Sequence, residues 1–214
     1  MDLIRYAEAE IPTAHGALRV FVYRDSKASS HETAEEHVAI VAGDVAGGTN
    51  ILTRVHSECW TSEVLGSLKC DCREQLDAAI DRIAAEGTGV VVYLRQEGRG
   101  IGLGNKVRAY ALQNDGADTV EANLALGFEA DERRYDLAAA ILKNLGIRSV
   151  RLLTNNPTKI AGLRASGVVI TERIGHWVGE NQYNADYLAV KRRKMGHHPD
   201  NQVKLRALPS VRKA

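Results

Sequence analysis

The sequence lacks a long apolar run and has almost no net charge. No apolar stretch approaches the ~20 residues that a helix needs to cross a bilayer. The formal net charge of the 214 residues is only +1, so the overall composition does not indicate binding to nucleic acid or to an anionic membrane. The first ten residues, MDLIRYAEAE, are acidic and alternating, unlike a secretory or transit peptide. We therefore expect a cytoplasmic protein with no nucleic-acid or membrane partner.

Cysteine is also scarce, and its three residues fall close together as Cys59, Cys70 and Cys72. An odd number in a reducing compartment argues against a disulfide framework and favours metal binding or catalysis. The close pair precedes a helical pattern, where a thiol ionises more readily, and zinc binds thiolates. Three protein ligands leave the fourth position of a tetrahedral zinc open for water, as in catalytic sites. The alternatives are three small buried apolar side chains, or a structural zinc completed by His56.

The apolar periodicity predicts a mixed α/β fold in a single domain. The first sixty residues contain four strand-like segments with β-branched residues, namely IRYAEAEIP, ALRVFVYR, HVAIVAG and NILTRVHS. After Cys72 the pattern alternates between helices and strands, with a helix that Gly87 ends, the strand VVVYLR, helices at 105–113, 119–126 and 135–145, the strand SVRLLT, a helix at 157–166, the strand VVITERI and a helix at 183–195. We expect a catalytic domain over 1–198 and a mobile basic tail over 199–214.

Two turns that follow strands could bind anions. The segment QEGRGIGLGNK at 96–106 has glycines that allow close backbone approach to a ligand, together with the positive charges of Arg99 and Lys106. It matches neither the P-loop nor the dinucleotide fingerprint, and alone it is equally well explained as a flexible turn. The turn TNNP at 154–157, with Lys159 beyond it, is better explained alone as a capped helix start.

These segments occur together and in a fixed order, and they resemble GTP cyclohydrolase II. The resemblance extends over about residues 3–198 and is highly specific as a joint pattern. The matching segments are RVHSEC at 54–59, CDC at 70–72 with Gln75, RQEGRGIGL at 95–103, NKVRAYALQ at 105–113, DTVEAN at 118–123, GFEADER at 127–133 and RLLTNNPTK at 151–159.

The resemblance implies a reaction and its cofactors. GTP would be the substrate, its guanine imidazole ring would open, formate would leave from C8 and pyrophosphate would be expelled. The product, 2,5-diamino-6-(5-phosphoribosylamino)pyrimidin-4(3H)-one, would begin riboflavin biosynthesis. One Zn²⁺ per chain would be held by Cys59, Cys70 and Cys72, Mg²⁺ would accompany the phosphates, and the chain would form a homodimer. We expect the monofunctional form, without a fused dihydroxybutanone phosphate synthase domain.

The resemblance also assigns site residues. Tyr110 would assist ring opening and deformylation, and Arg133 would attack the α-phosphate with Asp131 as its proton acceptor. Because arginine stays protonated in proteins, electrostatic stabilisation of the phosphoryl transition state is an equally good role for Arg133. The GTP contacts would be Arg54, Val55, His56, Ser57, Glu58, Gln75, Glu97, Gly98, Arg99, Thr119, Thr154 and Lys159.

Departures from the family pattern keep other functions open. Trp60, Ser62-Glu63 and Arg73 stand where the family commonly has leucine, Gly-Asp and glycine, and 174–177 is atypical. A paralogue that serves another heterocycle pathway, or stops at the formamide, is therefore an alternative. A zinc nucleobase deaminase would need a P-C-x-x-C motif that does not follow the H-x-E at 56–58. A non-catalytic GTP-binding protein would not need the implied catalytic set.

Overall fold

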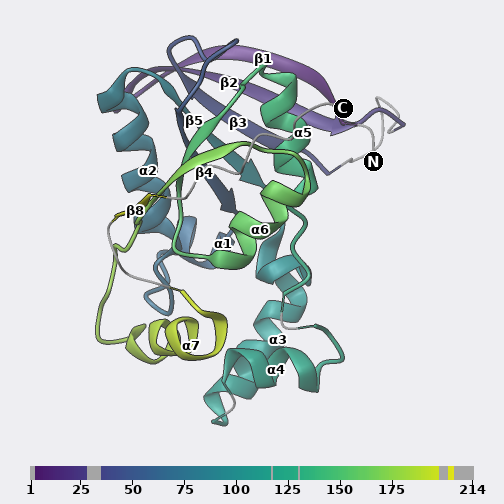
Figure 1. Cartoon of the computed structure of the whole chain (residues 1–214). Coiled ribbons are helices and arrows are strands. Elements are labelled where there is room, and N and C mark those ends of the chain that lie inside the picture. The colour runs from purple at the N-terminus through teal and green to yellow at the C-terminus, as the bar shows by residue number, and fades with distance from the viewer. Residues whose placement is uncertain (1–2, 28–34, 117, 130, 198–201, 205–214) are drawn as a thin grey trace, which may run out of the picture.

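A single mixed sheet organises the chain in this computed structural model, which describes residues 3–27, 35–116, 118–129, 131–197 and 202–204 (Figure 1). Its eight strands follow the order β1-β2-β3-β5-β4-β6-β7-β8. The strands are β1 (Leu3–Thr13), β2 (Gly16–Asp25), β3 (His37–Ala42), β4 (Ile51–Ser57), β5 (Gly89–Leu94), β6 (Val150–Leu153), β7 (Ile170–Ile174) and β8 (Gln202–Lys204). The predicted fold class, with strands first and alternating elements after them, is confirmed.

The helices lie where the sequence predicts them, with two short additions. The described helices are α1 (Trp60–Glu63), α2 (Cys72–Glu86), the 3₁₀ turn η1 (Glu97–Gly100), α3 (Gly102–Asn114), α4 (Thr119–Ala125), α5 (Asp136–Asn144), α6 (Pro157–Ala165) and α7 (Ala185–Met195). Gly87 ends α2 in the left-handed conformation, as predicted. Asn156 caps α6 through its side chain and Pro157 is the first helical residue, also as predicted.

The sheet brings the loops after its parallel strands to one edge. Strand β4 runs parallel to both β5 and β6, and β7 runs parallel to β6, whereas β1, β2 and β3 join antiparallel. The carboxyl ends of β4, β5 and β6 therefore share an edge, and ligands of open α/β sheets bind at such edges. Figure 1 shows α3, α4 and α7 gathered beyond this edge, below the sheet.

Apolar side chains cover both faces of the sheet. On one face Ile141 of α5 and Leu163 of α6 pack with Val90 and Val92 of β5, all fully buried. On the other face Ile83 of α2 packs with Val91, the residue between those two valines. This alternation along β5 is the period-two pattern of a strand covered on both sides.

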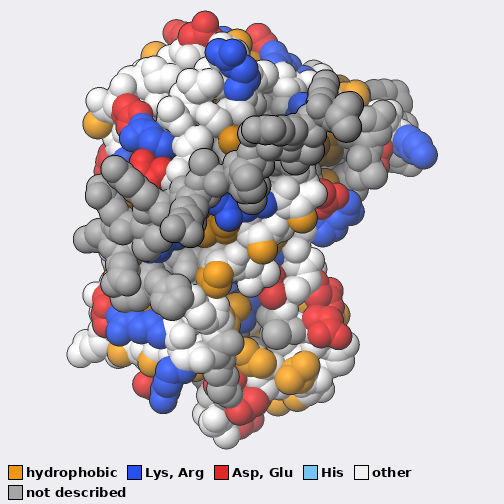
Figure 2. Space-filling model, in the orientation of Figure 1, with side chains coloured by type: hydrophobic (Ala, Val, Ile, Leu, Met, Phe, Trp, Pro, Cys, Tyr) orange, Lys and Arg blue, Asp and Glu red, His pale blue; other side chains and the backbone are white. Residues whose placement is uncertain are grey.

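The surface carries no large field of one sign in the view of Figure 2, where Lys and Arg side chains are interspersed with Asp and Glu. This mixture agrees with the small net charge. Within the described residues no helix is long and apolar enough to span a membrane. Of the predicted mobile tail, only 202–204 are described, as the backbone of β8, and the rest lies outside the described residues. The mobility of the tail stays a prediction.

Buried histidines should make the protein less stable in mild acid. Burial lowers the pKa of the fully buried His37 to about 4, from an ordinary value near 6.5. Between these two pH values His37 is protonated in the unfolded chain but stays neutral in the folded chain. The free energy of unfolding therefore falls as pH drops from 6.5 to 4. We expect His37 alone to contribute about 3 kcal/mol to this loss.

Urea unfolding of the wild type and His37→Gln at several pH values between 7 and 4 measures this effect. The variant should lose less stability over this window than the wild type does. His15→Gln is the control, because His15 is partly exposed and pairs with Asp81. Equal losses in the wild type and His37→Gln would contradict the prediction.

Candidate active site

One cavity opens beyond the carboxyl ends of β4, β5 and β6, where α3 and α7 complete its walls. It collects most of the residues that the sequence predicts for the site. The predicted residues in its lining are Arg54, His56, Ser57, Glu58, Cys59, Cys70, Cys72, Gln75, Glu97, Gly98, Arg99, Tyr110, Arg133, Thr154 and Lys159. Residues far apart in the sequence thus line the same cavity.

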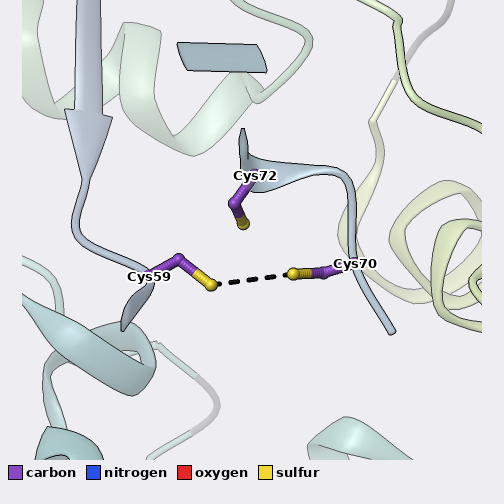
Figure 3. A group of neighbouring side chains, drawn as sticks. All are labelled: Cys59, Cys70 and Cys72. Carbon is purple, nitrogen blue, oxygen red and sulfur yellow. Dashed lines mark hydrogen bonds between the residues drawn. The ribbon is translucent and has the colours of Figure 1, made fainter. Parts of the chain in front are cut away.

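Three sulfur atoms converge at one side of this cavity (Figure 3). Cys59 precedes α1, Cys70 lies in the turn before α2, and Cys72 is the first residue of α2. Their sulfur atoms all lie within 4.8 Å of one another, and the Sγ atoms of Cys59 and Cys70 are 3.6 Å apart. Sulfurs bound to one tetrahedral zinc at about 2.3 Å would be about 3.8 Å apart. The spacing and the donor set therefore fit a zinc ion.

At this distance the ionisation of one cysteine changes the pKa of the other two. Hydrogen bonds from Cys70 and Cys72 hold the pKa of Cys59 far below its ordinary value, and the Lys106 ammonium lowers it further. The pKa of Cys72 is raised well above its ordinary value, because its hydrogen bonds with the other two cysteines and its burial favour the protonated form. A divalent cation would replace the protons that these sulfurs share.

Lys106 contacts the sulfur of Cys59, and Glu97 contacts Lys106 and the residue after Cys59. The Lys106 Nζ donates to the Cys59 Sγ at 3.1 Å and to the Glu97 Oε1 at 2.7 Å. The second oxygen of Glu97 accepts the backbone N–H of Trp60 at 2.5 Å. Burial alone would lower the pKa of Lys106, but the negative charges of Cys59 and Glu97 outweigh it, so Lys106 stays protonated.

Tyr110 reaches the same cavity from α3. Its hydroxyl lies 3.5 Å from the Thr61 Oγ1, and the residue is half-buried. Burial raises the pKa of Tyr110 to about 12, so its phenol keeps its proton at neutral pH. The side chain is therefore available as a hydrogen-bond donor near the cysteines.

Buried cations occupy the part of the cavity beside β4 and β6. Arg54 donates to the Leu153 carbonyl at 2.9 Å and to the Gln75 Oε1 at 2.5 Å, and burial lowers its pKa to about 10. Lys159 donates to the Val55 carbonyl, and burial together with the positive charges of Arg54 and Arg133 lowers its pKa strongly. Cations that repel each other in a buried site would be stabilised by an anion.

Arg133 is held by Asp131 in a two-point ion pair. The Arg133 Nε and Nη2 lie 2.8 and 2.5 Å from the two carboxylate oxygens of Asp131. Burial opposes both charges, but the pair raises the pKa of Arg133 and lowers that of Asp131. Both groups are therefore charged at neutral pH.

Within the glycine-rich turn, Gly100 packs against another loop of the chain. Gly100 has a positive φ of 96°, and a Cβ there would lie 3.0 Å from the backbone of Glu132. The Glu132 N–H also donates to the Arg99 carbonyl at 3.0 Å. Gly100 thus permits a close approach of the turn to the chain's own loop before Arg133. The turn positions the residues of the ion pair described above.

Three predicted residues do not present a described side chain to the cavity. Val55 is fully buried in the core, and only its carbonyl is engaged, by Lys159. Asp131 does not line the cavity, but it forms an ion pair with Arg133, which does. Thr119 begins α4, and its side chain lies outside what the structure describes.

The sequence motifs do not predict the contribution of α7 and the segments on either side of it. Trp177, Tyr187, Lys191 and His197 all line the cavity. The Lys191 Nζ lies 2.6 Å from the Oδ1 of Asp71, which is almost fully buried between two of the cysteines. The other Asp71 oxygen accepts from the Gln75 amide at 2.5 Å. The sequence signals were Asp71 within the CDC motif and the atypical segment 174–177, which contains Trp177, since α7 carries no motif.

Three clustered cysteines that could hold a metal ion share a cavity with buried cations, an arrangement that suits a metal-assisted enzyme for an anionic substrate. The chain belongs to the GTP cyclohydrolase II family, whose family model matches residues 4–175. It is 52% identical over 196 residues to the GTP cyclohydrolase-2 of Actinobacillus succinogenes, covering 91% of this chain and 87% of that protein. It is also 52% identical over 197 residues to the enzyme of that name from Yersinia pseudotuberculosis, covering 92% and 98%. The resemblance inferred from the motifs is confirmed.

A third relative links the family to a pathway. The riboflavin biosynthesis protein RibBA of Nocardia farcinica is 54% identical over 197 residues, which cover 92% of this chain and 46% of that protein. The family is thus one of hydrolases of riboflavin biosynthesis.

Proposed function

We propose that the protein hydrolyses GTP, with release of formate from C8 and of pyrophosphate, to give 2,5-diamino-6-(5-phosphoribosylamino)pyrimidin-4(3H)-one. The observation that carries this proposal is that three clustered cysteines and a buried group of cations face one cavity. The cysteines suit hydrolysis at the base, and the cations suit the phosphates. Riboflavin biosynthesis is the pathway that family membership supports.

Cys59, Cys70 and Cys72 would hold the zinc ion. When bound, zinc supplies Lewis acidity and makes hydroxide available from water near neutral pH. Lys106 keeps a positive charge against Cys59, and Tyr110 keeps a proton beside them. The chain thus provides a donor where an oxyanion forms and an amine departs.

The phosphates would bind among Arg54, Arg133 and Lys159. Because arginine stays protonated in proteins and the ion pair with Asp131 raises the pKa of Arg133 further, we assign Arg133 to electrostatic stabilisation of the phosphoryl transition state rather than to nucleophilic attack. Mg²⁺ would offset the remaining charge of the triphosphate. We also propose a homodimer and a cytoplasmic location, both from family resemblance and composition.

Incubation of the purified protein with GTP and Mg²⁺ tests this function directly. We expect mass spectrometry to identify the pyrimidine product, with formate and pyrophosphate released in equal amounts. A formamide product without formate would instead support a paralogue that stops early. Ammonia without formate would indicate a deaminase, and unchanged GTP would indicate a binding protein.

Loss of the Tyr110 hydroxyl should slow deformylation. Tyr110→Phe keeps the ring and removes only the donor, so the rate of formate release should fall by ~10²-fold while zinc content and GTP affinity stay unchanged. Formamide accumulation, followed by mass spectrometry, measures the effect. Tyr183→Phe is the matched control, because Tyr183 is exposed. An unchanged formate yield from Tyr110→Phe would make Tyr110 a packing residue.

A further inference from the structure

Two buried side chains of opposite charge, Lys106 and Glu97, lie close to Cys59 and its neighbour Trp60. The side chains of Lys106 and Glu97 are only 12% and 8% exposed and form an ion pair of 2.7 Å. Burying such a pair is costly unless further hydrogen bonds satisfy both groups. In this protein those further bonds join Lys106 to the Cys59 sulfur and Glu97 to the backbone N–H groups of Trp60 and Gly98.

Lys106 acts on the sulfur of Cys59. Its Nζ lies 3.1 Å from the Sγ, a charge-assisted hydrogen bond that stabilises negative charge on this sulfur. Lys106 belongs to α3, 47 residues along the chain from Cys59, so the contact exists only when α3 packs against the turn after β4.

Glu97 acts on the backbone beside Cys59. One oxygen accepts the N–H of Trp60, the next residue in the chain, at 2.5 Å. The other accepts both the Gly98 N–H and the Lys106 Nζ, each at 2.7 Å. The carboxylate is therefore committed to donors of the chain itself, although the family resemblance implies a GTP contact for Glu97.

We propose that Glu97 and Lys106 are positioning residues that fix Cys59 as a zinc ligand from two sides. Glu97 holds the backbone at Trp60 and aims the ammonium of Lys106, and that ammonium orients the sulfur and supports its charge. Partners of this kind orient metal ligands, and their loss typically reduces metal affinity by 10–100-fold. This inference rests on the proposed zinc site.

The chain offers a matched control in Lys69. This second lysine also lines the cavity, and its Nζ lies 5.1 Å from the centroid of the Tyr110 ring, compared with 5.7 Å for Lys106. Its hydrogen bond goes to the Asn114 side chain at 2.8 Å, not to a cysteine. Lys69→Met therefore removes the same charge from the same cavity without touching the sulfur.

Competition between the zinc-loaded protein and a chromogenic chelator tests the inference. Lys106→Met and Glu97→Gln should each lose about 10–100-fold in zinc affinity, Lys106→Arg should keep part of it, and Lys69→Met should match the wild type. With Co²⁺ in place of zinc, the sulfur-to-metal absorption band should shift in Lys106→Met and not in Lys69→Met. Thermal melts identify any variant that fails to fold, and Lys106→Arg then carries the test.

Two outcomes would overturn the inference. Wild-type zinc affinity in folded Lys106→Met, with a raised KM for GTP, would make Lys106 a substrate contact. Equal losses in Lys106→Met and Lys69→Met would show a general effect of charge in the cavity. A wild-type protein that binds no zinc would instead overturn the proposed metal site itself, so the two failures are distinguishable.

Discussion

Replacing Cys70 or Cys72 with serine is expected to reduce bound zinc and formate release to background together. The two sulfurs that remain cannot complete the three-ligand site, and a serine hydroxyl is a poor substitute for a thiolate. Metal analysis and a formate assay on the same preparation measure both effects. The cations proposed to bind the phosphates, Arg54, Arg133 and Lys159, do not belong to the segment 70–72. Binding of GTP should therefore persist in the folded variants. Full formate release by a zinc-free variant would contradict the assignment of the cysteines.

Replacing Arg133 with alanine should lower pyrophosphate release by about 10³-fold, because a fixed positive charge would no longer stabilise the phosphoryl transition state. Zinc content should not change. Arg134→Ala is a closely matched control, since Arg134 forms the same kind of ion pair, 2.5 Å from Asp136, but is exposed. Normal pyrophosphate release by Arg133→Ala would contradict the assignment.

Two further variants separate the roles of this pair. In the electrostatic role, Arg133→Lys should retain part of the rate because the charge remains. Asp131→Asn should cost less than Arg133→Ala, because the guanidinium stays protonated without its partner. If Asp131 instead accepted a proton from a nucleophilic arginine, Asp131→Asn would be as damaging as Arg133→Ala. Pyrophosphate release rates of the three variants decide between the roles.

Local patterns were enough to predict most elements and the cluster of three cysteines. The helix from Cys72 to Gly87 follows from its apolar spacing and terminal glycine, and the Asn156-Pro157 cap follows from its residue types. The three cysteines are close in sequence, so the short chain between them limits how far apart they can lie. Function-related chemistry was therefore visible before any long-range contact was known.

Other features depend on contacts that no local pattern contains. Helix α1 has only four residues, too few for a periodic signal, and it forms where Glu97 binds the Trp60 amide from 37 positions away. Lys191 meets Asp71 across 120 positions. Gly100 lies against the Glu132 backbone, because the turn packs against the loop that carries Arg133. Such contacts can be identified only from the three-dimensional structure.

Ring opening should depend on one zinc ion held by the three cysteines. The most direct measurement is a titration of metal-free protein with Zn²⁺, with formate release followed at saturating GTP and Mg²⁺. We expect the rate to rise from background in proportion to added zinc and to level off at about one zinc per chain. A metal-free protein that releases formate at the full rate would contradict it.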